Sequence, residues 1–139
     1  MNVNAKEYLL EIRSKRRQLE RLKNRRKDLH LDVSFGAIAY DADHVQSSPK
    51  NKLEEAMVKL SNRMAYLDRK IAELSVEIDD RINSIESLEN VRYRDVLYKV
   101  YVEYKSFEEI SVEMKYTYKY TRNLHGEALN ELAKNVYFS

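Results

Sequence analysis

The amino-acid sequence predicts an all-α protein, with a long antiparallel helical hairpin forming a coiled-coil stalk and a three-helix helix-turn-helix head after it. Only two glycines and one proline occur among the 139 residues, so few turns or strands can be accommodated. Apolar residues recur at helical steps of three and four along most of the chain. Capping residues precede several of these runs. We expect the stalk over residues 1–90 and the head over residues 91–139.

The first helix is expected from Asn4 to about Leu31, because this stretch contains no glycine or proline. Asn4 can cap its start, with Glu7 three residues later. One apolar seam runs along it at heptad spacing, with Leu9 and Leu10 beside it: Tyr8, Ile12, Leu19, Leu22 and Leu29.

A row of arginines follows a second face of this helix at intervals of four residues: Arg13, Arg17, Arg21 and Arg25. Residues 1–30 hold ten Lys/Arg against four Asp/Glu, so the row lies in the most basic part of the chain. Like charges at this spacing repel by a few tenths of a kcal/mol per pair. Two interpretations stay open. Acids of the second helix, such as Asp68 and Glu77, neutralise the row, or it contacts phosphate or an acidic protein surface.

Residues 31–48 are expected to form a connecting loop, which combines an apolar patch with three acidic residues. A loop of this length exceeds the usual helix-helix connection, which is compatible with a functional or mobile role. The alternative is that Phe35, Ile38 and Tyr40 fold back and cover the open end of the hairpin.

The second helix is expected from Pro49 to about Asn90, with Ser48 as its cap. Its apolar seam has coiled-coil spacing, with Arg81 in one seam position: Leu53, Met57, Leu60, Met64, Leu67, Ile71, Leu74, Ile78, Ile85 and Leu88. Folded about the expected loop, the hairpin would bring Tyr8 near Ile71 and Leu74. The seam beyond Val76 would then lack a partner helix, so we expect it to pack on the head or in a homodimer.

The head begins with a third helix from Asn90 to Tyr104, capped by Asn90. Ser106 and Glu109 then form a capping box for a short helix, and Thr117 caps the next one. The apolar residues of this pair fall at helical spacing: Phe107, Ile110, Met114, Leu124, Ala128, Leu129 and Leu132. Two short helices around a tight turn are typical of a helix-turn-helix.

The first exposed residues of the last helix are long, polar or aromatic, and they follow the capping Thr117: Tyr118, Lys119, Arg122 and Asn123. A helix that enters the major groove of DNA at its N-terminal end needs such residues there. Lys115 occupies the turn, where a left-handed conformation would cost about 1 kcal/mol.

Two motifs of the head, F-E-E-I-S-x-E-M and T-x-x-x-T-R-N-L-H-G-E-A-L, resemble the C-terminal promoter-recognition region of sigma factors. With V-Q-S-S-P at residues 45–49 and a charged hairpin in front, the chain is similar to small phage-encoded transcription regulators of the RinA/ArpU type. The resemblance implies base contacts by Tyr118, Lys119, Arg122 and Asn123. Since Tyr118 departs from the residues that sigma factors carry at the start of this helix, it implies no particular promoter sequence.

Other classes of function find little support in the composition. The chain has no cysteine, no apolar run of the roughly 20 residues that a membrane span needs, and no apolar signal sequence, which favours a cytoplasmic location, in a bacterial host cell if the protein is phage-derived. His30, His44 and His125 are too scattered for a metal site or a catalytic base. We therefore expect no enzyme activity, no cofactor and no metal.

The sequence thus predicts a sequence-specific regulator that binds promoter DNA as a homodimer. One form of this hypothesis adds RNA polymerase as a partner. The alternative is an interaction protein without DNA binding, such as a coiled-coil adaptor in phage packaging or assembly, or an inhibitor of a host factor. Residues 91–139 carry eight Lys/Arg against seven Asp/Glu, and this near-neutral balance favours the alternative.

Overall fold

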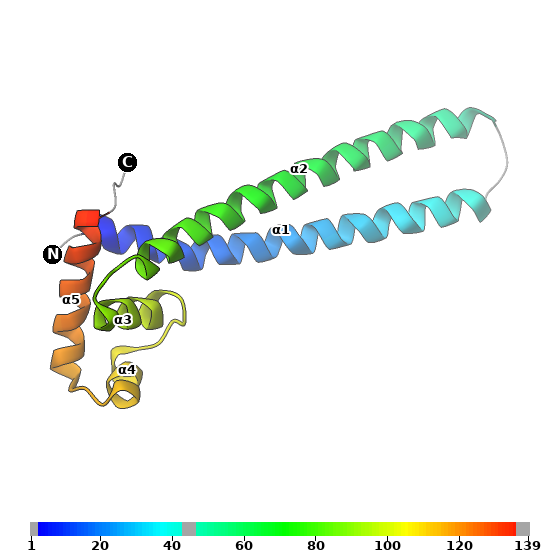
Figure 1. Ribbon diagram of the computed structural model, residues 1–139. Coiled ribbons are helices and arrows are strands. Elements are labelled where there is room, and N and C mark those ends of the chain that lie inside the picture. Colours follow the sequence, from blue (N-terminus) through cyan, green and yellow to red (C-terminus); the bar gives the residue numbers. More distant parts are fainter. Residues whose placement is uncertain (1–2, 43–46, 136–139) are drawn as a thin grey trace. The chain divides into compact units, whose positions relative to one another are not determined.

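The computed structural model describes the backbone of residues 3–42 and 47–135, and the side chains of residues 4–32 and 51–135. Within these ranges the chain is all-helical, with five helices and no strand. In chain order the helices are α1 (Val3–Ala42), α2 (Ser47–Glu86), α3 (Val91–Tyr101), α4 (Phe107–Met114) and α5 (Tyr118–Asn135), as Figure 1 shows. His44 and part of the expected loop lie outside the described residues.

The end of α1 differs from the sequence prediction. α1 continues to Ala42, so the loop expected over residues 31–48 is wrong for residues 31–42. A single glycine, Gly36, is tolerated inside a helix at a cost of about 1 kcal/mol and therefore does not act as a stop signal. α2 begins at Ser47, next to the predicted Ser48-Pro49 start.

The chain divides into two compact units, each of which contains a segment of α1 and a segment of α2. The first unit comprises Met1–Arg16 and Val76–Ser139, and the second comprises Arg17–Ser75. The first unit therefore holds the start of α1, the end of α2 and all of α3, α4 and α5.

In the first unit, polar contacts fix the register between α1 and α2. Lys15 Nζ lies 2.8 Å from Glu77 Oε2, and Tyr8 Oη lies 3.4 Å from Ser84 Oγ. The partner on α2 rises in number as the residue on α1 falls, so the two segments are antiparallel. Tyr8 was expected near Ile71 and Leu74, and that prediction is wrong because the longer α1 moves the connection between the helices.

This register provides a partner for the seam near the end of α2. Ile78, Ile85 and Leu88 are no more than 5% exposed. The seam is covered within the chain, so its burial requires no second protomer and gives no support to the expected homodimer.

Arg81 interrupts the apolar seam of α2 but is accommodated by α1. Its Nε donates to the backbone oxygen of Tyr8 at 3.2 Å, and its guanidinium lies 4.6 Å from the centre of the Tyr8 ring. The same guanidinium forms an ion pair with Glu11. The charge is therefore paired and hydrogen-bonded, as a largely buried cation must be.

In the second unit, α1 and α2 also bury apolar side chains. Leu29 of α1 and Leu67 and Leu74 of α2 are buried, and the other seam residues of α2 in this unit are half-buried. An ion pair between Arg26 Nε and Asp68 Oδ1 at 2.8 Å joins the two helices. The predicted seam of α2 is therefore an inner face.

The three C-terminal helices of the first unit pack on one another, α5 against both α3 and α4. Their buried side chains are Val96, Leu97, Tyr101, Ile110, Thr121, Leu124, Ala128, Leu129 and Leu132. Burial of each large apolar side chain contributes about 1.5–3 kcal/mol. Asn90 caps α3 as predicted, since its side chain accepts a hydrogen bond from the Arg92 amide at 3.0 Å.

α3 ends at Tyr101, before the predicted end at Tyr104. Tyr104 has a left-handed backbone with φ of 59°, which is uncommon for a bulky residue. Two arginines of α1 hold its side chain. Arg13 lies over the ring at 5.0 Å from its centre, and Arg16 donates to the Tyr104 hydroxyl at 3.1 Å and to the Val102 carbonyl at 2.9 Å. These contacts attach the start of α1 to the end of α3.

Candidate functional site

The start of α5 is held in place by its cap. Thr117 Oγ1 accepts a hydrogen bond from the Tyr120 amide at 3.1 Å, and the Thr117 carbonyl accepts one from the Thr121 amide at 3.0 Å. The buried Thr121 hydroxyl donates to the same carbonyl at 3.0 Å. Thr117 thus acts as the predicted N-cap, and the first turn of α5 is fixed by short-range bonds.

The turn between α4 and α5 is equally well defined. Ser106 caps α4 by accepting from the Glu109 amide at 3.2 Å. Lys115 ends α4 in the left-handed conformation anticipated from the sequence, with φ of 59°, and the Tyr116 amide donates to the Ser111 carbonyl at 2.9 Å. This hydrogen-bonded turn sets the direction in which α5 leaves α4.

The predicted site residues lie together at the first turns of α5. Tyr118, Lys119, Arg122 and Asn123 are all exposed, as is the capping Thr117. Between them Thr121 is fully buried and faces the core with Leu124. The start of α5 therefore presents one polar face to solvent and an opposite face to α3 and α4.

Aromatic rings surround this polar face. The Tyr118 ring lies edge-on to Phe107 with centroids 6.1 Å apart, and the Tyr116 and Tyr120 rings are edge-on at 4.9 Å. Arg92, at the start of α3, donates from Nη1 to the Tyr120 hydroxyl at 3.1 Å. Arg92 thus joins the site although the sequence prediction missed it, because a contact between residues so distant in the chain leaves no local pattern.

The cations of the head fall into two groups, those that form ion pairs and those that do not. Lys99 and Lys105 are each paired with Glu103 and with Glu113, and the hydrogen bonds from Lys105 and Lys99 lower the pKa of the Glu113 carboxyl.

Five other cations of the head make no ion pair with any residue that the structure describes: Arg92, Arg94, Lys115, Lys119 and Arg122. Three of them lie at or next to the start of α5, and Arg92 reaches it through Tyr120. Residues 115–123 therefore carry three cations and no acid, within a head whose total charge is near neutral.

His125 lies behind the polar face. Its Nε2 is 2.8 Å from Tyr101 Oη, the two rings are stacked at 5.6 Å, and Phe107 approaches the imidazole edge-on at 5.1 Å. Burial, with a smaller contribution from the Lys6 ammonium, lowers the pKa of His125 to about 4. His125 is thus neutral at pH 7 and belongs to the packing between α3, α4 and α5.

The arginine row of α1 is exposed along its length. The cross-helix ion pairs involve Lys15 and Arg26 in place of the row. Arg13 lies over Tyr104, and the other three members form no ion pair with a residue in the described ranges: Arg17, Arg21 and Arg25. Neutralisation of the row by acids of α2 is therefore not observed.

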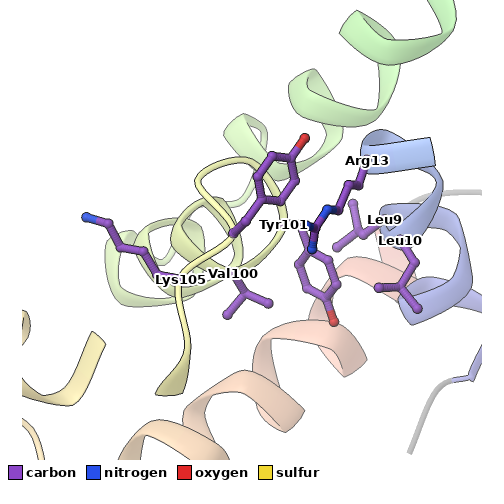
Figure 2. Close-up of a pocket in the computed structure, with 7 residues that line it drawn as sticks. Leu9, Leu10, Arg13, Val100, Tyr101 and Lys105 are labelled. Carbon is purple, nitrogen blue, oxygen red and sulfur yellow. The ribbon is translucent and has the colours of Figure 1, made fainter. Parts of the chain in front are cut away.

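A small cleft lies in the first unit between α1 and the end of α3, with a volume of about 220 Å³. Figure 2 shows Leu9 and Leu10 on one side and Val100 and Tyr101 on the other, with the Arg13 side chain reaching between them and the Lys105 side chain directed away. Ligand sites usually have about 300–1,000 Å³ and several convergent polar groups. The cleft thus has the character of a packing crevice.

Among the described side chains, those of residues 4–32 and 51–135, no three from His, Cys, Asp or Glu gather in a way that could hold a metal ion. Nor does any helix in the described ranges combine the length and apolar character that crossing a bilayer requires.

Comparisons with protein-family models, with curated proteins and with solved structures found no match to this chain.

Proposed function

We propose that this protein is a sequence-specific DNA-binding regulator of transcription, in which α4 and α5 form a helix-turn-helix and α3 is its supporting helix. The observation that carries the proposal is the capped, exposed and positively charged start of α5. Such a helix end, with long polar side chains on its outer face, suits the major groove of duplex DNA.

Each exposed residue has a role that its chemistry allows. Arg122 is suited to a bidentate contact with guanine and Asn123 to one with adenine. Lys119 is suited to a phosphate contact, and Tyr118 to a phosphate or to a thymine methyl group. Arg92, close to the first turn of α5 through Tyr120, can add a second phosphate contact from another helix.

The resemblance to sigma factors and to RinA/ArpU-type regulators of phages supports promoter DNA as the target. In that setting, the exposed arginines of α1 are available to contact an acidic surface of RNA polymerase. This proposal does not need the homodimer expected from the sequence. That expectation came from the apolar seam at the end of α2, and this seam is buried within the chain. Sedimentation velocity at micromolar concentration would determine the number of copies.

The experiment begins with selection of duplexes from a randomised pool by the wild-type protein. We expect an enriched sequence that binds more tightly than a scrambled duplex. Arg122→Ala should lose about 1–3 kcal/mol of this discrimination, which corresponds to about fivefold to 150-fold in affinity ratio. Fluorescence anisotropy with labelled duplexes at fixed salt measures both affinities.

Arg63→Ala is the matched control, because Arg63 is an exposed arginine of α2 that forms no ion pair with a described residue. The proposal fails if Arg122→Ala and Arg63→Ala bind the selected and scrambled duplexes alike, or if selection enriches nothing.

The second candidate is an interaction protein whose active surface is the helix pair. The observation that favours it is the set of exposed arginines on α1 that pair with no carboxylate among the described residues, which suits an acidic protein surface. Absence of any DNA affinity, together with binding of an acidic protein that requires these arginines, would favour this candidate.

A further inference from the structure

Gly126 lies in the middle of α5, and neither the backbone conformation nor the packing of the described residues requires a glycine there. Glycine is among the least favourable residues in a helix interior. No glycine in the described residues has a positive φ, so the backbone does not require it. A Cβ atom built on Gly126 would meet no heavy atom of the described chain within 4 Å, so packing does not require it either.

The position of Gly126 relates it to the proposed DNA contacts. Residues three and four apart on a helix share a face, so Gly126 lies one turn beyond Asn123 and Arg122, and two turns beyond Lys119. All three of these side chains are exposed. Gly126 therefore forms a low point on the same strip of surface.

The surroundings of this low point suit a polyanion. Lys119 and Arg122 make no ion pair with a residue in the described part of the chain. The neighbouring Glu127 accepts a hydrogen bond from the Tyr93 hydroxyl at 3.4 Å, which orients it toward α3. Glycine allows another backbone to approach a helix more closely than any other residue.

We infer that Gly126 is the point where the sugar–phosphate backbone of bound DNA passes closest to α5. This inference rests on the proposed function and deepens it. The DNA contact then extends into the third turn of α5 and does not end at Asn123. The helix would lie along the groove for this distance, and a side chain at position 126 would obstruct it.

The test uses Gly126→Ala and Gly126→Leu in the full-length chain, with the duplex selected by the wild-type protein. Because the space around position 126 is open in the free protein, both variants should fold. Gly126→Ala should raise Tm by about 3 °C through helix propensity. It should nevertheless weaken DNA binding by about fivefold, and Gly126→Leu by more than about 30-fold, since obstruction grows with side-chain size.

Asn83→Ala is the matched control, because it improves helix propensity at an exposed position of α2 and should leave DNA affinity unchanged. If both Gly126 variants bind as tightly as wild type while Arg122→Ala binds more weakly, the inference is wrong and the proposed function stands. If the wild-type protein binds no selected duplex, the proposed function fails and the inference fails with it.

Discussion

At the scale of single residues, His125 connects the packing of the head to pH. The imidazole stacks on Tyr101 and contacts Phe107, an environment that penalises its charged form. Its pKa of about 4 lies below the ordinary value of 6.5, so the unfolded chain binds a proton more readily than the folded one. The stabilisation is therefore complete above pH 6.5 and is lost as the pH falls toward 4.

We expect the free energy of unfolding to fall by about 1–2 kcal/mol between pH 7 and pH 5, allowing for the partial exposure of His125. His125→Gln should be less stable at pH 7 but lose much less over this interval, because glutamine does not titrate. Urea unfolding followed by circular dichroism at both pH values provides the measurement. Equal losses in the two proteins would show that other groups cause the pH dependence.

Lys115 is a second residue whose conformation has a measurable cost. It ends α4 with φ of 59°, a region that glycine enters without a steric penalty. Lys115→Gly should therefore raise the free energy of unfolding by about 0.5–1 kcal/mol.

Tyr104→Gly is the comparison for this substitution, since Tyr104 has the same φ but its ring contacts Arg13 and its hydroxyl accepts from Arg16. The loss of these contacts should cancel or reverse the gain there. A destabilised Lys115→Gly protein in urea titration would contradict this account of the turn.

At the scale of elements, the start of each head helix could be predicted because its signal is local. Asn90, Ser106 and Thr117 each accept a backbone hydrogen bond from the next few residues, as their sequence context indicated. The end of α1 could not be predicted in this way, since Gly36 and the acids near it resemble a loop. The wrong end at Leu31 then produced the wrong register between α1 and α2.

The remaining site contacts depend on tertiary structure. Arg92 reaches Tyr120, and Tyr101 reaches His125, only because α3 packs against α5. A single sequence contains no periodic pattern that pairs such positions. The exposed face of α5 could be predicted from the sequence. The apolar residues of this helix recur at helical spacing and mark its buried face, so the remaining positions face solvent.

The cap of α5 gives a prediction at this scale. Thr117→Ala removes the acceptor of the Tyr120 amide and should cost about 1 kcal/mol of stability. It should also loosen the turn that presents Lys119 and Arg122. Thr117→Ser retains the acceptor and is expected to behave like wild type in thermal unfolding, whereas an alanine variant of unchanged Tm would contradict the capping role.

At the scale of the whole molecule, the chain consists of two units joined through the continuous helices α1 and α2. The unit of residues 17–75 carries exposed arginines that stabilise nothing evident in the described chain, at positions 17, 21 and 25. Cations at this spacing repel one another by a few tenths of a kcal/mol per pair. We therefore propose that the row serves a partner and not the fold.

Replacement of Arg17, Arg21 and Arg25 by glutamine should leave the free energy of unfolding unchanged or slightly higher, because only repulsion is lost. The single substitution Arg26→Gln removes the pair with Asp68 and is the control that should be slightly less stable. A clear loss of stability in the triple variant would contradict the assignment of this row to a partner. If the row contacts DNA phosphates, the triple variant will also show a shallower salt dependence of duplex binding.

The central claim is that duplex DNA is bound by the outer face of the first turns of α5. The most direct measurement is a titration of the ¹⁵N-labelled protein with the selected duplex, followed by amide chemical shifts. The account predicts that the largest changes cluster at residues 117–126 and at Arg92, with residues 51–75 unaffected. Changes confined to the helix pair, or no changes at saturating DNA, would contradict it.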